Sequence, residues 1–290
     1  MNTSRLALGT AQFGLAYGIT NRSGQLAPHD ISAVLARARV AGVTTLDTAI
    51  AYGDAEARLG RCDLSGFSVV TKLPPYAATL PGAEWVDSHL EESRTRLGVR
   101  PAALLLHRAG DLLGPAGADI AEALERALAE GRVGGIGVSV YAPTDLDAVS
   151  GRLPWTDVQV PVNVCDRRMA ESGWLGRLAD AGVRVHARSA FLQGLLLQSA
   201  DSLPPGFATW RPLWGRWTAW LSEQSLSPLA ACLGFVLSVP EVHRVVVGVD
   251  GVVHWEGLLA ACPETPVAVP DWMAVSDPAL IDPTRWSRAS

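Results

Sequence analysis

Short apolar runs alternate along the chain with segments in which apolar residues recur at helical spacing. The helical segments are expected at 28–41, 83–97 and 119–130, and a glycine follows each of them. The apolar runs are rich in Leu and β-branched residues and have the length of strands. Eight such strands are expected, at 6–11, 44–49, 68–73, 103–108, 134–140, 157–164, 184–191 and 244–250.

Strands that are apolar throughout and are separated by helices indicate a parallel sheet with its outer face covered. Eight such units predict an α/β protein with a closed (β/α)8 barrel, the TIM barrel. An open doubly wound sheet is the alternative, but its GxGxxG signature at the first helix is missing. No linker is evident, so we expect one domain over 1–290. The least regular part, 199–225, follows the seventh strand and is expected to be a loop and helix on the substrate side.

Composition and charge exclude several classes of function and partner. The chain is 48% hydrophobic and 18% charged, which is typical of a globular protein. A net charge of −5 without long basic runs argues against nucleic acid or an anionic membrane as a partner. The four cysteines show no metal-ligand spacing, so no metal site is expected. Without a secretory signal or a long apolar span, we expect a soluble cytoplasmic protein. Its oligomeric state stays open.

Four polar residues follow strand-like runs at the point where each run ends. They are Asp47, Tyr52, Lys72 and His107. The carboxyl ends of barrel strands meet at one mouth, so we expect these side chains to lie close together. A carboxylate, a phenol, an amine and an imidazole in one cleft can transfer a proton to or from a substrate.

The chemistry of these groups suggests their roles. A phenol titrates near pH 10, and a neighbouring ammonium is expected to lower the pKa of Tyr52. Asp47 would keep the ammonium of Lys72 charged and in place. His107 can hold a substrate oxygen by a hydrogen bond.

Four motifs carry a resemblance to a known family. The segment DTAIAYGDAEARLG at 47–60 resembles the DTAxxYGxxExxLG motif of the aldo-keto reductases. VVTKLPP, which contains Lys72, and LLLHR, which contains His107, resemble the next two signatures of that family. The opening LGTAQFGLAYGI resembles the first-strand motif of a bacterial branch of the family. The resemblance extends over about residues 5–262.

This resemblance implies a barrel that binds NADPH, or less often NADH, across its mouth without a Rossmann domain. It implies hydride transfer to the carbonyl of a small molecule: an aldehyde, a ketone or a keto-sugar. Tyr52 would be the general acid, Lys72 and Asp47 would tune it, and His107 would orient the carbonyl oxygen.

The resemblance also implies cofactor-binding positions. Ser139 and Gln159 would bind the nicotinamide carboxamide, although Val140 replaces the usual asparagine beside Ser139. Farther along the chain, the segment ARSAFLQGLL resembles AYSPLxxGLL. Its residues Ser189, Leu192 and Gly194 would line the pyrophosphate.

Three further positions are expected to contact the cofactor, and two of them are charged. Arg188 replaces the aromatic residue that usually stacks on the nicotinamide. It could stack in its place, bind an anionic group, or pair with a barrel carboxylate such as Asp47. Gly248 fits a close backbone approach to a phosphate. Asp250 lies where a cation for the 2′-phosphate is usual, and a carboxylate there favours a free ribose hydroxyl and therefore NADH.

Tryptophans recur at helical spacing within 199–225. Such a stripe either packs against the barrel or forms an aromatic wall for a ring-shaped substrate. If the stripe forms an aromatic wall, Trp210 and Trp214 are the expected substrate-contacting residues, because they lie nearest the loop.

Two other functions remain open at this stage. Lys72 could form a Schiff base in a barrel lyase or isomerase. The chain could also be a cofactor-binding barrel with little turnover, because residues that usually grip the cofactor are replaced.

Overall fold

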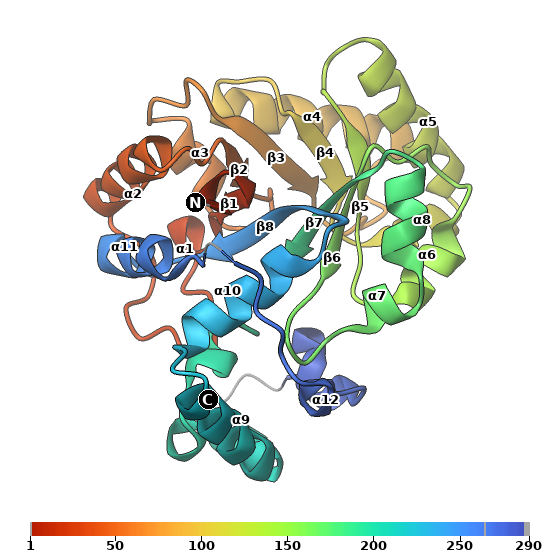
Figure 1. Cartoon of the computed structure of the whole chain (residues 1–290). Coiled ribbons are helices and arrows are strands. Elements are labelled where there is room, and N and C mark those ends of the chain that lie inside the picture. The colour runs from red at the N-terminus through yellow and green to blue at the C-terminus, as the bar shows by residue number, and fades with distance from the viewer. Residues whose placement is uncertain (1, 264, 287–290) are drawn as a thin grey trace.

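Eight parallel strands close into a barrel in the order β1 to β8, with β8 paired to β1. The computed structural model describes residues 2–263 and 265–286. The closed barrel confirms the predicted (β/α)8 fold and rules out the open sheet (Figure 1). The strands are β1 (Leu6–Gly9), β2 (Thr45–Asp47), β3 (Ser68–Leu73), β4 (Ala103–Leu106), β5 (Ile136–Ser139), β6 (Asp157–Pro161), β7 (Arg184–Arg188) and β8 (Val242–Gly248).

Helices follow the strands and cover the outside of the barrel (Figure 1). The α-helices are α1 (Ala11–Gly14), α2 (Pro28–Val40), α3 (Ala55–Leu59), α4 (Gly82–Leu97), α5 (Gly117–Ala129), α6 (Pro143–Val149), α7 (Arg168–Glu171), α8 (Trp174–Asp180), α9 (Arg211–Glu223), α10 (Pro228–Ser238), α11 (Val252–Ala261) and α12 (Pro278–Ile281). The 3-10 turns are η1 (Asn2–Arg5), η2 (Ala109–Leu113), η3 (Leu195–Leu197), η4 (Ala200–Ser202), η5 (Pro205–Trp210), η6 (Asp271–Met273) and η7 (Pro283–Arg285).

The three helices expected from the sequence are present within two residues of their predicted bounds. Helix α2 begins with a proline, whose missing N–H costs nothing in a first helical turn. Helix α4 ends at Gly98, which takes the left-handed conformation with φ of 68°. The apolar faces of these helices pack onto the barrel, which explains their periodicity.

Most strands end one to three residues before the apolar pattern does. The run 157–164, for example, leaves the sheet after Pro161 and continues as an irregular segment. After β1, β2, β5 and β6 the next residues are still buried, so the hydrophobic pattern continues although the hydrogen-bonded ladder has stopped. These short extensions form the mouth of the barrel.

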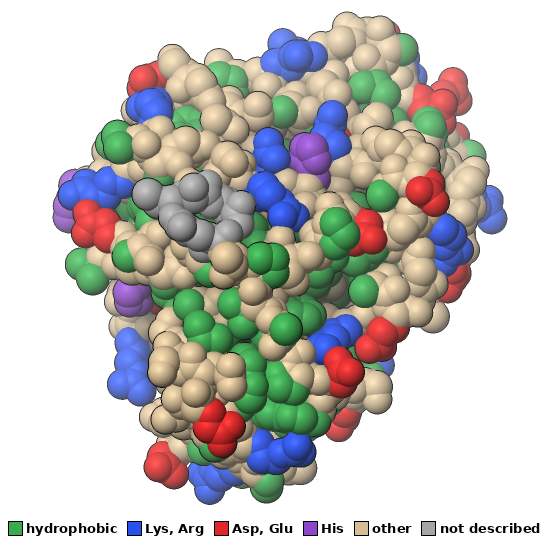
Figure 2. Space-filling view, viewed as in Figure 1, with side chains coloured by type: hydrophobic (Ala, Val, Ile, Leu, Met, Phe, Trp, Pro, Cys, Tyr) green, Lys and Arg blue, Asp and Glu red, His purple; other side chains and the backbone are tan. Residues whose placement is uncertain are grey.

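The described residues contain two large apolar clusters. One fills the barrel and the space beneath its helices. The other lies beside the barrel, around α9, η3 and α12. In Figure 1, α9 and α12 lie at one end of the molecule, away from the strands. Figure 2 shows hydrophobic side chains gathered over the region between α10 and α12, with charged side chains around the edge of the same face.

The interpretation of the tryptophan stripe as an aromatic wall is wrong for Trp214. Its side chain is fully buried in the second cluster, and its indole N–H donates to the Leu195 carbonyl at 3.3 Å. Trp210 is half-buried and packs against Phe207, with 6.0 Å between ring centroids. The stripe therefore holds α9 against η3 and serves packing.

No helix in the described part of the chain is both long and apolar enough to cross a membrane.

Candidate active site

The ends of β2, β3 and β6 meet in a buried ion pair. Lys72 Nζ lies 2.7 Å from Asp47 Oδ2 and donates a second hydrogen bond to the Thr48 carbonyl at 2.9 Å. Gln159 Nε2 donates to the other Asp47 oxygen at 2.7 Å. Lys72 has no exposed surface, so its ammonium depends on these partners in place of water.

Tyr52 and His107 complete the cluster above this pair. Lys72 Nζ lies 5.2 Å from the centroid of the Tyr52 ring. The Tyr52 and His107 rings meet edge to face, with 5.8 Å between centroids. The structure therefore brings together all four residues that the sequence placed at the barrel mouth.

Two glycines set the position of Tyr52. A Cβ on Gly14, at the end of α1, would lie 1.7 Å from the Tyr52 carbonyl oxygen. Gly53 has φ of 58°, and a Cβ there would lie 2.4 Å from the Gly14 carbonyl oxygen. The turn that carries Tyr52 thus fits against α1 only because both residues lack side chains.

The electrostatics keep the Tyr52 phenol protonated. Burial and the nearby Asp47 carboxylate raise its pKa well above the ordinary value, and the positive charge of Arg188 opposes them. The expectation that Lys72 lowers this pKa below the ordinary value is therefore wrong, because burial and the Asp47 carboxylate outweigh the positive charge of Arg188.

His107 is neutral at physiological pH. Burial, with the positive charges of Lys72 and Arg188, lowers the pKa of its imidazole to about 4. Burial also lowers the pKa of Lys72, while its ion pair with Asp47 acts in the opposite direction. The site can thus offer one protonated phenol and one neutral imidazole N–H to a bound oxygen.

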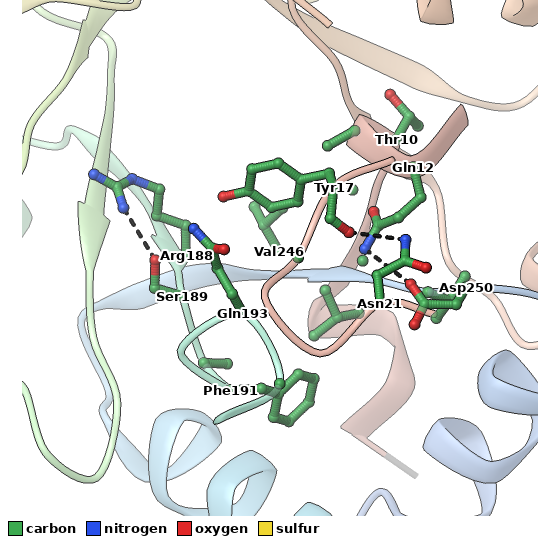
Figure 3. Close-up of a pocket in the computed structure, with 18 of the residues that line it drawn as sticks. Thr10, Gln12, Tyr17, Asn21, Arg188, Ser189, Phe191, Gln193, Val246 and Asp250 are labelled. Carbon is green, nitrogen blue, oxygen red and sulfur yellow. Dashed lines mark hydrogen bonds between the residues drawn. The ribbon is translucent and has the colours of Figure 1, made fainter. Parts of the chain in front are cut away.

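A cavity of about 710 Å³ opens at these strand ends. Tyr52 and His107 line it. Ser139 of β5 and Gln159 of β6, which are paired across the two strands, line it as well. Figure 3 shows Arg188 at one end of the residues drawn and Asp250 at the other. The cavity therefore has a cationic side chain, Arg188, at one end and an anionic side chain, Asp250, at the other.

Two polar atoms on the cavity floor have no protein partner among the described residues. They are Ser139 Oγ and Gln159 Oε1, and both side chains line the cavity. A hydroxyl that donates and an amide oxygen that accepts are complementary to a carboxamide. The floor fits the carboxamide of a nicotinamide in this respect.

The opposite end of the cavity is formed by β8 and α11. Helix α11 has no side-chain cap, and His254 and Gly257 from it line the cavity. Uncapped N–H groups at a helix start attract phosphate. Gly248 lies against Gln12, whose Oε1 would be 2.7 Å from a Cβ there. This end fits the phosphate-bearing half of a dinucleotide.

Asp250 gives that end a negative charge. Gln12 Nε2 donates to its Oδ1 at 3.4 Å, and His254 Nδ1 lies 3.7 Å from its Oδ2. No Lys or Arg among the residues lining the cavity lies beside Asp250, and Arg188 lies at the far end.

The structure places the remaining predicted positions differently. Ser189 and Gly194 line the cavity, whereas Leu192 is fully buried in the second cluster and does not. Neither Trp210 nor Trp214 lines it, and nor does any other residue of 199–225. That segment lies behind the wall formed by η3 and does not face the cavity.

Arg188 makes no ion pair with Asp47, one of the roles considered from the sequence. Its guanidinium donates to the Val140 carbonyl at 2.8 Å and to Ser189 Oγ at 3.0 Å. It also lies 4.1 Å from the centroid of the Tyr141 ring.

Several cavity residues were not found from the sequence. They come mainly from the glycine-rich connection after β1 and from the segment after β7: Gln12, Tyr17, Asn21, Phe191 and Gln193. The unusual length of the first connection was the available signal, since long loops after barrel strands build the mouth.

A cavity that holds titratable side chains at the carboxyl ends of a closed parallel barrel is the arrangement of barrel enzymes. The sequence model of the aldo/keto reductase family matches residues 5–274, so this chain belongs to the aldo/keto reductase family and is an oxidoreductase.

Solved structures agree with the fold. The aldo-keto reductase AKR11C1 from Bacillus halodurans, in its holo form, superposes with a TM-score of 0.69 at 21% identity, covering 91% of this chain and 88% of that one. The glycerol dehydrogenase AKR11B4 from Gluconobacter oxydans gives 0.68 at 20% identity, covering 93% and 88%. No curated protein sequence matches this chain.

Proposed function

We propose that this protein reduces the carbonyl group of a small aldehyde, ketone or keto-sugar with a reduced nicotinamide cofactor. When bound, the cofactor supplies a hydride to the carbonyl carbon, and the products are an alcohol and the oxidised nicotinamide. Tyr52 acts as the general acid and gives its phenolic proton to the carbonyl oxygen. His107 orients that oxygen through a hydrogen bond.

The observation that carries the proposal is the cluster of Tyr52, His107 and the buried Lys72–Asp47 pair. Tyr52 remains protonated until a substrate oxygen takes its proton. The ammonium of Lys72, 5.2 Å from the ring centroid, then stabilises the phenolate that forms. Asp47 holds the ammonium charged and in place.

The Schiff-base alternative is not supported. An imine-forming lysine must be neutral and reachable by substrate. Lys72 has no exposed surface and donates to both Asp47 and the Thr48 carbonyl.

Ser139, Gln159 and the start of α11 are the residues proposed to hold the cofactor. Family resemblance points to NADPH, whereas Asp250 favours NADH, because a carboxylate repels a 2′-phosphate and accepts from a ribose hydroxyl. Fluorescence titration of both cofactors decides between them. We expect NADH to bind at least as tightly as NADPH, and about tenfold tighter NADPH would refute this preference.

The main test is oxidation of NADH and NADPH against a panel of aldehydes, ketones and keto-sugars. Tyr52→Phe should lower kcat/KM by about 100- to 10,000-fold, because it removes the acid but little volume. Tyr76→Phe is the matched control, since its hydroxyl lies outside the cavity and donates to the Leu80 carbonyl. An unchanged rate in Tyr52→Phe removes Tyr52 as the acid. Tight cofactor binding without oxidation by any carbonyl supports the binding barrel instead.

A further inference from the structure

Arg188 carries a positive charge into the cavity, and no carboxylate of the described residues forms an ion pair with it. Its two hydrogen-bond acceptors, the Val140 carbonyl and Ser189 Oγ, are neutral. The Tyr141 ring beneath it is neutral as well. A guanidinium has five N–H donors, so three of them have no partner among the described residues.

The carboxylates of the cavity are engaged elsewhere. Asp47 is bound by Lys72 and Gln159. Asp250 lies at the opposite end, beside Gln12 and His254 (Figure 3). A half-buried charge usually has a partner, because removing it from water is costly. In this cavity the partner has to come from a ligand.

The surroundings hold this guanidinium in place. Ser189, directly after β7, is left-handed with φ of 61°, an unfavourable conformation for a residue with a side chain. Its carbonyl accepts a hydrogen bond from Asn163 Nδ2 at 3.1 Å. The Tyr141 backbone is fixed by Asp145 at its N–H and by Arg168 at its carbonyl. A charge held so firmly loses little freedom when a ligand binds.

Arg188 also acts on the reacting groups. Its charge lowers the pKa of His107 and opposes the rise in the pKa of Tyr52. Arg188, Tyr52 and His107 all line the same cavity. An anionic group bound at Arg188 would therefore share the cavity with the proposed proton donor.

We propose that Arg188, stacked on Tyr141, binds the carboxylate of an oxo acid whose carbonyl group is reduced at Tyr52. The planar guanidinium fork matches the two oxygens of a carboxylate. This inference rests on the proposed function and names its substrate class. Arg188 is a substrate-binding residue in this scheme and takes no part in the proton or hydride transfer.

The test compares matched substrates that differ only in charge. Each oxo acid, such as 2-oxobutanoate or 4-oxobutanoate, is paired with its methyl ester, and the ratio of their kcat/KM values is measured. We expect the wild type to favour the acid about 10- to 100-fold, the range that a charge-assisted pair contributes. In Arg188→Met this ratio should fall at least about tenfold. Arg188→Lys keeps the charge but loses the planar fork. Its acid-to-ester ratio should lie between those of the wild type and Arg188→Met.

The control variant is Arg61→Met, which removes an exposed arginine outside the cavity and should keep the wild-type ratio. If Arg188→Met lowers the rates for acid and ester equally, Arg188 acts on the cofactor or the fold, and the substrate proposal is overturned. An acid-to-ester ratio near one in the wild type overturns it as well.

A binding measurement keeps the inference separate from the proposed reaction. Oxamate and succinate, which carry carboxylates but no reducible ketone or aldehyde, are titrated calorimetrically into wild type, Arg188→Met and Arg61→Met. Binding that is lost only in Arg188→Met supports the carboxylate site even if no carbonyl is reduced. Reduction of neutral carbonyls without any carboxylate binding leaves the proposed function standing and overturns the role of Arg188.

Discussion

At the scale of the residue, the stability of the site depends on whether each buried charge keeps its partner. Asp47 is 3% exposed and Lys72 is not exposed at all. Removing one member of such a pair leaves an uncompensated charge, which costs more than the pair itself contributes.

Lys72→Met should therefore lower the free energy of unfolding by about 3–5 kcal/mol, measured by urea denaturation at neutral pH. The double variant Asp47→Leu with Lys72→Met should lose less than the sum of the two single variants, because no charge is then left alone. A fully additive double variant would show that the two charges do not stabilise one another.

His107 provides a prediction for pH. An unfolded histidine titrates near 6.5, whereas burial brings the pKa of His107 to about 4. Between these values the unfolded chain binds a proton and the folded chain does not, so folding loses stability as the pH falls from about 6.5 to 4. NMR titration of the imidazole nitrogens should show His107 neutral at pH 6. A pKa near the ordinary value would contradict the burial of this ring.

At the scale of the element, the position of the proposed acid depends on how closely α1 approaches the turn after β2. Gly14 touches the backbone of Tyr52, so any side chain at 14 must push the turn away. Displacement of a reacting group by even about 1 Å can cost 100-fold in rate.

Gly14→Ala should reduce kcat/KM by about 100-fold, with a smaller effect on cofactor affinity, measured by steady-state kinetics and titration. Gly215→Ala in α9 is the control, because a Cβ there meets no atom within 4 Å. It should stabilise the helix by about 0.5–1 kcal/mol and leave the rate unchanged. Wild-type kinetics in Gly14→Ala would show that the turn can shift without moving the phenol.

At the scale of the whole molecule, the barrel and the second cluster are expected to unfold together as one domain. Phe191 and Phe235 pack against both clusters and connect them. Leu104 is fully buried in the barrel cluster and Leu280 in the second one.

Leu104→Ala and Leu280→Ala should each lower stability by about 2–5 kcal/mol and shift a single urea transition. Circular dichroism and tryptophan fluorescence should report the same midpoint for each variant. If Leu280→Ala instead produces a separate early transition, the second cluster is an independent unit.

The barrel could be predicted from sequence because its apolar runs repeat at every strand, and the four-residue cluster because its members lie at or just after the ends of β2, β3 and β4. The surroundings of Arg188 could not, because its acceptors are a carbonyl and a hydroxyl set by the left-handed backbone at Ser189. The burial of Trp214 does not follow from the sequence for a related reason: helical spacing shows which residues share a face, but not which segment that face contacts. The burial of Trp214 depends on η3, a contact between separate segments.

The enclosure of Lys72 has a practical consequence, since it is the only lysine in the sequence. Reagents that acylate or cross-link lysine amines find none on the surface of the folded protein, because this one has no exposed surface. Amine-directed dyes, beads or linkers therefore cannot attach through a lysine of the folded protein. Labelling with such reagents should therefore leave the ion pair beneath Tyr52 untouched.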